Sequence, residues 1–192
     1  MNVFILGTGR CGTASFIEAT TFIDNYTAGH ESRLRNYGPS KLHYPKNHIE
    51  ADNRLSWFLG RLDKEYGDDA FYVHLTREKD KVAQSFNKRW NHKYGIINGY
   101  AKGVLGLKNK NIDIIYDYID TVESNIQHFL KNKSNKMHIE IEKVKKEFPI
   151  FWKKINAKGE LEEAIKTFNS PKNKSKFSLF KKVIQIKQNI YK

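Results

Sequence analysis

The segment VFILGTGRCGTAS, residues 3–15, decides the fold. Its apolar start predicts a short buried strand over residues 2–6, and the residues after the glycines predict a helix that runs to about Phe22. The turn at residues 7–12 contains three glycines, which allow the backbone to close around a ligand. Because the free N–H groups and the dipole at the start of a helix attract anions, the segment predicts an anion site.

Strand and helix patterns alternate from this segment to about residue 90. A polar stretch at residues 25–47, which contains Pro39 and Pro45, interrupts the alternation. The alternation predicts a three-layer α/β fold, a central parallel sheet with helices on both faces, whose ligands bind beyond the carboxyl ends of the strands. The other expected elements are strands at residues 48–51, 70–76 and 137–141, and helices at residues 52–66, 79–90, 111–130, 142–155 and 177–190.

The length and composition predict one compact domain, residues 1–192. Hydrophobic residues make up 39% of the chain and aromatic residues 13%, which is enough for a packed core and excludes wholesale disorder. The one cysteine, Cys11, excludes an internal disulfide and a cysteine-rich zinc site. No run of about 18 apolar residues occurs, and the apolar run at residues 3–6 is only four residues long with no basic region before it, so we expect no signal peptide and no membrane span. The lone cysteine indicates a reducing compartment, and we expect a cytoplasmic protein.

The formal net charge of +13 is unevenly distributed along the chain. Residues 131–192 hold 17 Lys and 6 Glu, and they form a Lys-rich C-terminal part that we expect to be helical. A basic module that binds nucleic acid or another polyanion is one alternative function, although few aromatic residues alternate with these lysines, so no nucleic-acid partner is expected. All seven arginines fall between Arg10 and Arg89, which predicts an oxyanion site in the first half of the chain.

Three kinds of phosphate loop compete for the glycine turn. The spacing Gly7-x-Gly9-x-x-Gly12 matches the dinucleotide fingerprint of an NAD(P)-binding Rossmann protein, and it has the span of a Walker A loop. The Walker A hypothesis lacks its lysine, because Thr13 follows Gly12. The Rossmann hypothesis needs a second apolar strand that ends in an acid, whereas residues 23–31 are polar.

The third kind of loop comes from a family resemblance carried by two motifs. Residues 10–15, RCGTAS, resemble the 5′-phosphosulfate loop of the sulfotransferases that use 3′-phosphoadenosine 5′-phosphosulfate (PAPS). Residues 77–85, REKDKVAQS, resemble the 3′-phosphate motif of the same family, an Arg at a strand end with a Ser eight residues later. An Arg fork and a hydroxyl can together hold a phosphate dianion. The resemblance covers residues 1–90 and implies the P-loop-like sulfotransferase fold.

The resemblance implies an enzyme that transfers a sulfonate group from PAPS to a hydroxyl or amine, with PAP as the product and no metal. It implies a carbohydrate or small-molecule acceptor. It also implies that Arg10 and the backbone amides of the loop stabilise the negative charge of the transition state. Ala14 stands where the family commonly has Thr or Ser, which removes one hydroxyl contact to the sulfonate. The expected cofactor-binding residues are Gly9, Arg10, Cys11, Gly12, Thr13, Ala14, Ser15, Arg77 and Ser85.

Two adjacent residues compete for the role of general base. We favour Glu31, because related enzymes place a catalytic Glu or His in this region and a carboxylate can deprotonate an acceptor hydroxyl. His30 is the alternative, since imidazole titrates near neutral pH. Of the other polar residues, the group His48, Glu50 and Asp52 is assigned to acceptor binding or helix capping, and His74 to the core as a histidine with a satisfied partner.

Overall fold

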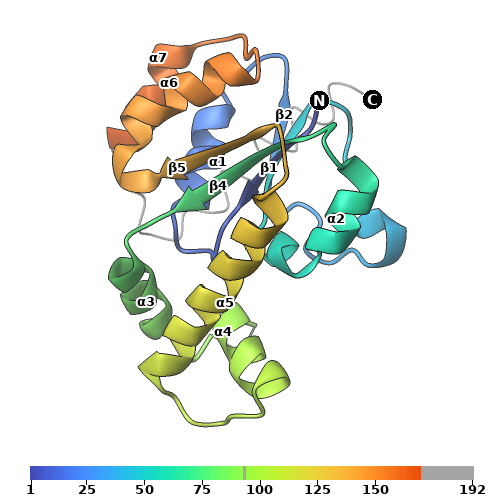
Figure 1. Cartoon of the computed structure of the whole chain (residues 1–192). Helices are drawn as coiled ribbons and strands as arrows, with labels where there is room; N and C mark the ends of the chain where they lie inside the picture. The colour runs from blue at the N-terminus through green and yellow to red at the C-terminus, as the bar shows by residue number, and fades with distance from the viewer. Residues whose placement is uncertain (93, 170–192) are drawn as a thin grey trace.

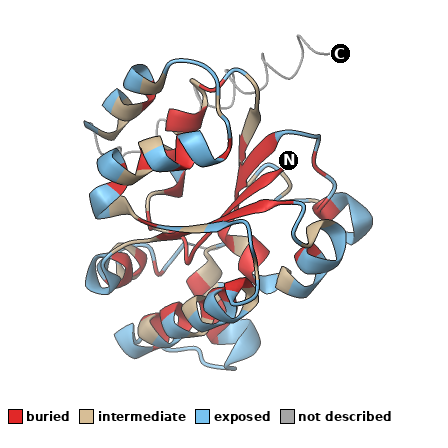
Figure 2. Ribbon diagram, turned by 45° about the horizontal axis from the view of Figure 1, so that its top comes forward, coloured by how far each residue is buried: buried red, intermediate tan, exposed pale blue. Residues whose placement is uncertain are grey.

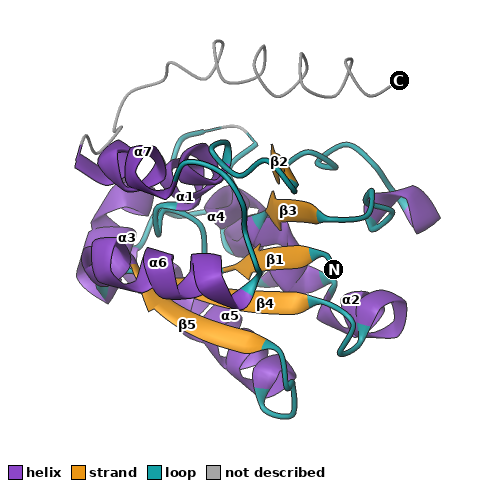
Figure 3. Ribbon diagram, turned by 90° about the horizontal axis from the view of Figure 1, so that it is seen from above, coloured by secondary structure: helices purple, strands orange, loops and turns teal. Residues whose placement is uncertain are grey.

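The computed structural model describes residues 1–92 and 94–169 of the chain. At its centre lies a parallel sheet with the strand order β2-β3-β1-β4-β5; Figure 1 shows the sheet, and Figure 3 labels all five strands. The five strands are β1 (Val3–Leu6), β2 (Thr27–His30), β3 (His48–Ala51), β4 (Phe71–Thr76) and β5 (Lys136–Glu140).

Helices cover both faces of this sheet and make the three layers that the sequence predicts (Figures 1 and 3). One face carries α1 (Thr13–Thr20), α6 (Val144–Lys154) and α7 (Leu161–Lys166), and the other carries α2 (Leu59–Tyr66), α3 (Lys79–Asn87), α4 (Ile96–Gly99) and α5 (Ile112–Leu130). The prediction of an α/β fold is therefore confirmed.

The central strand β1 shows how the two cores are filled. Val3 and Ile5 belong to the core beneath α1 and α6, whereas Phe4 and Leu6 belong to the core beneath α5. All four side chains are fully buried, as the red central strands in Figure 2 show. A strand that is covered on both faces needs an unbroken apolar run, which is why residues 3–6 were recognisable in the sequence.

The strand order separates this fold from the two common dinucleotide and flavin folds. Here β1 lies between β3 and β4, and β2 forms the edge beyond β3. In the classic Rossmann order, the strand after the first helix lies beside the first strand, and the flavodoxin-like order also pairs those two strands. The order of this sheet therefore matches neither.

The strand β2 lies in a segment whose sequence does not predict it, because residues 23–31 lack an apolar run. Thr27–His30 pairs in parallel with β3, with Gly29 opposite Glu50 and His30 opposite Ala51. The strands expected from the sequence did not include this one. An edge strand has only one sheet neighbour and can carry polar residues, so its pattern is weak.

Several helix boundaries also differ from those expected. Residues 52–66 do not form one helix, since Asp52 caps a short 3₁₀ turn, Asn53–Trp57, and α2 begins only at Leu59. The expected helices at residues 13–22, 79–90 and 142–155 are shorter in the structure, and the last begins after the 3₁₀ turn Ile141–Lys143. Besides β2, the elements that the sequence patterns did not predict include α4, the π-helical turn Tyr100–Val104 and α7.

The helix expected at residues 177–190 lies outside the described residues. Within residues 1–92 and 94–169, no helix has the length and apolarity that crossing a membrane requires.

Candidate functional site

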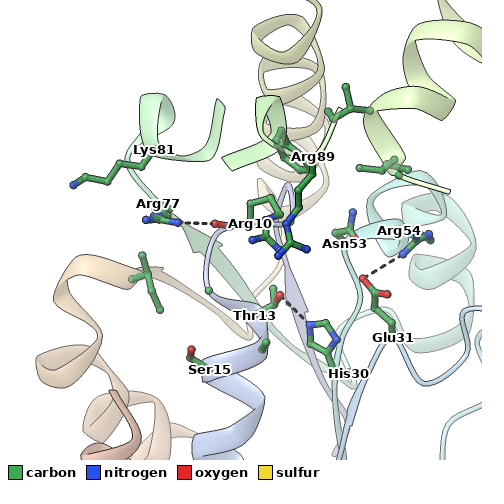
Figure 4. Close-up of a pocket in the computed structure, with 18 of the residues that line it drawn as sticks. Arg10, Thr13, Ser15, His30, Glu31, Asn53, Arg54, Arg77, Lys81 and Arg89 are labelled. Atoms are coloured by element: carbon green, nitrogen blue, oxygen red, sulfur yellow. Dashed lines mark hydrogen bonds and ion pairs between the residues drawn. The ribbon is translucent and has the colours of Figure 1, made fainter. Parts of the chain in front are cut away.

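A cavity of about 640 Å³ opens at the carboxyl edge of the sheet, where the loops after all five strands converge (Figure 4). This edge is where open α/β sheets bind ligands, at the point where connections from the central strand diverge. Among its lining residues are Gly9, Arg10, Gly12, Thr13, Ala14, Ser15, His30, Glu31, Asn53, Arg54, Arg77, Lys81, Arg89 and Glu142.

The glycine loop between β1 and α1 forms one wall. Gly9, Arg10 and Gly12 have positive φ angles of 81°, 60° and 98°. At Gly12 a Cβ atom would lie 2.6 Å from Ile141 Cδ1, so the position requires glycine for space as well as for conformation. Gly12 is also the N-cap of α1 and offers no side chain to the first N–H groups of the helix, which suits a loop that holds an anion with its backbone.

The two motifs that resemble PAPS-binding motifs meet in this wall. Arg10 Nε donates a hydrogen bond to Ser85 Oγ at 2.9 Å, although the two residues lie 75 positions apart. Arg77 Nη1 donates to the carbonyl oxygen of Arg10 at 3.2 Å. The pairing of β1 with β4 brings the glycine loop beside Arg77, the first residue after β4.

Like charges gather around the loop. Burial lowers the pKa of Arg10, and the neighbouring guanidinium groups of Arg89 and Arg77 lower it further. Four of the seven arginines line the cavity: Arg10, Arg54, Arg77 and Arg89. Because clustered guanidinium groups repel one another, an anion bound among them would relieve the repulsion.

The opposite wall carries the two candidates for a general base. His30 Nε2 lies 3.1 Å from Thr13 Oγ1, and Glu31 Oε1 lies 3.2 Å from Arg54 Nη1 (Figure 4). Burial lowers the pKa of His30, against the opposing effect of the carboxylates of Glu31, Glu50 and Asp52. His30 is therefore a neutral imidazole at neutral pH.

Not every expected cofactor residue lines the cavity. Cys11 is 1% exposed and packs in the core beneath α1, where burial raises the pKa of its thiol to about 12. Its side chain is therefore inert, and Cys11 can meet a ligand only through its backbone. Ser85 reaches the site through its hydrogen bond with Arg10, whereas Ala14 and Ser15 line the cavity directly.

The cavity residues that were not singled out from the sequence include Asn53, Arg54 and Arg89. Asn53 and Arg54 follow β3, and Arg89 lies just beyond α3. The confinement of arginine to residues 10–89 was the signal available for the two arginines. It could not distinguish Arg54 and Arg89 from Arg33, Arg35 and Arg61, which do not line the cavity.

The remaining polar candidates have structural partners. Asp52 caps the turn Asn53–Trp57 by accepting a hydrogen bond from the Arg54 amide, which confirms helix capping as its role. His48 and Glu50 are buried on β3, and His48 Nε2 lies 3.0 Å from Glu50 Oε2. His74 is 7% exposed, so the prediction that it is buried is confirmed. Its Nε2 lies 2.7 Å from Glu123 Oε2, within ion-pair distance but without hydrogen-bond geometry, so the predicted satisfied hydrogen bond is not observed.

Comparison with known proteins supports the fold. No family model matches the chain, and no curated protein matches it in sequence. Several solved structures match the chain, and two of them illustrate the likeness along most of its length. The sulfotransferase domain from the curacin biosynthetic pathway has a TM-score of 0.58 and 12% identity, and covers 90% of this chain and 78% of that one. Mouse sulfotransferase SULT7A1 complexed with PAP has a TM-score of 0.59 and 16% identity, and the match covers 91% of this chain and 68% of that one. The chain thus has an α/β fold like that of sulfotransferases.

Proposed function

We propose that the protein is a sulfotransferase that takes a sulfonate group from PAPS and gives it to a hydroxyl or amine of a carbohydrate or other small molecule. The single observation that carries this proposal is the meeting of residues 10–15 and residues 77–85 in one cavity, through the Arg10–Ser85 and Arg77–Arg10 hydrogen bonds. Two motifs that the family uses for opposite ends of one cofactor are therefore within reach of one ligand. A solved structure of the same fold holds PAP.

The charge and shape of the cavity fit a donor with several anionic groups. Arg10, Arg77 and Arg89 supply cations on one side, and the loop from Gly9 to Gly12 supplies backbone N–H groups. The volume of about 640 Å³ lies within the range of about 300–1,000 Å³ that is usual for small-molecule sites. Arg77 and Ser85 are the proposed ligands of the 3′-phosphate, and residues 9–15 are the proposed ligands of the phosphosulfate end.

Bound PAPS supplies an activated sulfonate, whose transfer leaves PAP. The chain supplies orientation, charge stabilisation and a base. Arg10 stabilises the negative charge that develops on the leaving oxygen, together with the N–H groups at the start of α1. Glu31 takes the proton of the acceptor group, and Arg54 holds the Glu31 carboxylate in place at 3.2 Å. His30 is neutral and lies against Thr13, so it is the second candidate for the base.

As the resemblance implies, the proposed reaction uses no metal. The four arginines that line the cavity provide the positive charge instead.

The proposal is tested by incubating the purified protein with PAPS labelled in its sulfonate group and a panel of sugars, phenols, alcohols and amines. We expect label in at least one acceptor, with equal formation of PAP. The Arg77→Ala variant should lose most of this transfer, and Arg35→Ala, an exposed arginine outside the cavity, should keep it. Absence of both transfer and PAP formation across the panel would contradict the proposal.

A further inference from the structure

Directly behind Glu31, a buried network of charged and polar side chains joins β2, β3 and the segment that follows β2. Glu50 and Asp52 are 0% exposed, and Lys41 is 3% exposed. Burying charged groups is costly unless they are paired and hydrogen-bonded, so such a cluster calls for an explanation beyond packing. None of these three side chains lines the cavity.

Glu50 holds the residue that comes immediately after Glu31. Its Oε1 accepts a hydrogen bond from the backbone N–H of Ser32 at 2.8 Å, and its Oε2 accepts one from Ser32 Oγ at 2.5 Å. Its Oε2 also lies 3.0 Å from His48 Nε2, and His48 Nδ1 lies 2.7 Å from Thr27 Oγ1. Both oxygens of the carboxylate are thus engaged, and the carboxylate is fixed from β2 and from β3.

Lys41 and Asp52 hold the chain on the other side of this turn. Lys41 Nζ donates to the carbonyl oxygen of Arg33 and to Asp52 Oδ2, at 3.1 Å in each case. Asp52 Oδ1 accepts from the backbone N–H of Arg54 at 2.9 Å. Arg54 is the residue whose guanidinium pairs with Glu31.

The backbone of Glu31 needs this support. Its φ is +51°, a left-handed conformation that non-glycine residues adopt only when the surrounding structure imposes it. The Glu31 N–H donates to the carbonyl oxygen of Ala51 at 2.9 Å, which fixes the residue on its N-terminal side. Ser32 and Arg33, on its C-terminal side, are fixed by Glu50 and Lys41.

Gly29 makes the contact between Glu50 and Ser32 possible. A Cβ atom at Gly29 would lie 2.5 Å from Glu50 Oε2 and 2.9 Å from Ser32 Cβ. Any larger residue would push the carboxylate away from Ser32. This requirement explains a glycine in the middle of β2, where it would otherwise weaken the strand.

We propose that Glu50 is a positioning residue that holds the turn at Glu31 so that the Glu31 carboxylate stays in the cavity beside Arg54. The inference rests on the proposed function for the meaning of that position, although the contacts themselves do not depend on it. Glu50 touches neither the cavity nor Glu31 itself, and it acts through Ser32.

Two variants test the role from opposite sides of the contact. Glu50→Gln keeps the size of the side chain but removes one acceptor and the charge, and Gly29→Ala pushes on the same carboxylate from β2. Their matched controls are Glu65→Gln, an exposed glutamate on α2, and Gly60→Ala, where a Cβ meets nothing within 4 Å. Each variant is measured by amide hydrogen exchange, by PAP affinity and by the rate of PAP release from PAPS with water as the acceptor.

We expect Glu50→Gln and Gly29→Ala to speed amide exchange at residues 31–33 by about tenfold, the effect of one lost hydrogen bond, and to leave exchange at residues 10–15 unchanged. PAP release should slow by about tenfold or more, while the dissociation constant of PAP changes by less than about twofold, because a misplaced base affects the chemical step and not donor binding. The controls should match the parent protein.

Unchanged exchange at residues 31–33 in both folded variants would overturn the positioning role. A lower melting temperature combined with parental PAP release would also overturn it, since Glu50 would then serve stability alone. Failure of the proposed function can be distinguished from failure of the positioning role. In that case the parent protein itself would neither bind PAP nor release it from PAPS.

Discussion

Arg10 Nε donates a hydrogen bond of 2.9 Å to Ser85 Oγ, and this bond connects the glycine loop after β1 with the helix after β4. The two residues belong to the motifs proposed to hold opposite ends of PAPS. Ser85 is a partner of Arg10 in the structure, and this contact competes with its proposed role as a ligand of the 3′-phosphate. The strands β1 and β4 are neighbours in the sheet, and this pairing makes the contact possible over 75 residues.

Replacing Arg10 tests the charge stabilisation. Arg10→Ala removes a guanidinium from the centre of the cavity, and turnover should fall by about 10²–10³, the usual effect of losing one donor that stabilises transition-state charge. The measurement is the rate of PAP formation at saturating PAPS. Arg35→Ala is the matched control, because Arg35 is exposed and does not line the cavity. Turnover of Arg10→Ala within about threefold of the parent would remove Arg10 from the mechanism.

Ser85 should matter for binding more than for turnover. Ser85→Ala deletes one hydrogen-bond donor to the proposed 3′-phosphate. PAP should bind about 10- to 100-fold more weakly, since a hydrogen bond to a charged group contributes about 1.5–3 kcal/mol. Isothermal titration calorimetry with PAP measures the change. Ser124→Ala, an exposed serine on α5, is the control. If the two variants bind PAP equally well, Ser85 is no ligand of PAP.

Gly12 is required for two separable reasons, a positive φ and a close neighbour. Gly12→Ala puts a Cβ 2.6 Å from Ile141 Cδ1 at a φ of +98°, whereas Gly106→Ala meets nothing within 4 Å at a φ of +68°. The left-handed conformation alone costs about 1–2 kcal/mol, which lowers the melting temperature by about 2–8 °C in a chain of this size. In thermal unfolding, Gly12→Ala should lower the melting temperature more than Gly106→Ala does, because it adds the clash with Ile141. If both variants lower the melting temperature equally, the contact with Ile141 imposes no constraint on residue 12.

His30 predicts a pH dependence of stability. Burial holds the pKa of His30 in the folded protein below its ordinary value of 6.5, so the unfolded chain binds the proton more readily. The free energy of unfolding should therefore decrease as the pH falls below about 6.5, and His30→Gln should reduce this decrease. Urea unfolding at pH 7.5 and pH 5.0 measures both. The exposed His43, replaced in the same way, is the control, and equal pH slopes in the parent and His30→Gln would contradict the burial argument.

The sequence predicted the elements that are buried on both faces and missed those whose pattern depends on tertiary context. β1 and β4 are apolar throughout most of their length because helices cover both sides. β2 is polar because it forms an edge, and its Gly29 serves the carboxylate of Glu50 on another strand. No local pattern along β2 contains that relationship.

The residues of the candidate site also fall into those that the sequence predicted and those that only the structure shows. The glycine loop and Arg77 were predictable, because each follows a recognisable strand and resembles a motif. Arg54 and Arg89 became visible only in the structure, since their positions depend on how the turn after β3 and the end of α3 meet the loop. The arrangement of Glu31 also needed the structure, because its support comes from Glu50 on β3 and from Lys41 and Asp52, whose contacts with the turn no local pattern shows.

The most direct test of the central claim is the thermal stabilisation of the protein by PAP, compared with NADP, ATP and sulfate at equal concentration. A ligand at about 100 times its dissociation constant adds about 2.7 kcal/mol of stability, which raises the melting temperature by about 5–10 °C in a chain of this size. We predict a shift of this order with PAP alone, and its loss in Arg77→Ala. Stabilisation by NADP without an effect of PAP would contradict the account and assign the glycine loop to a different nucleotide.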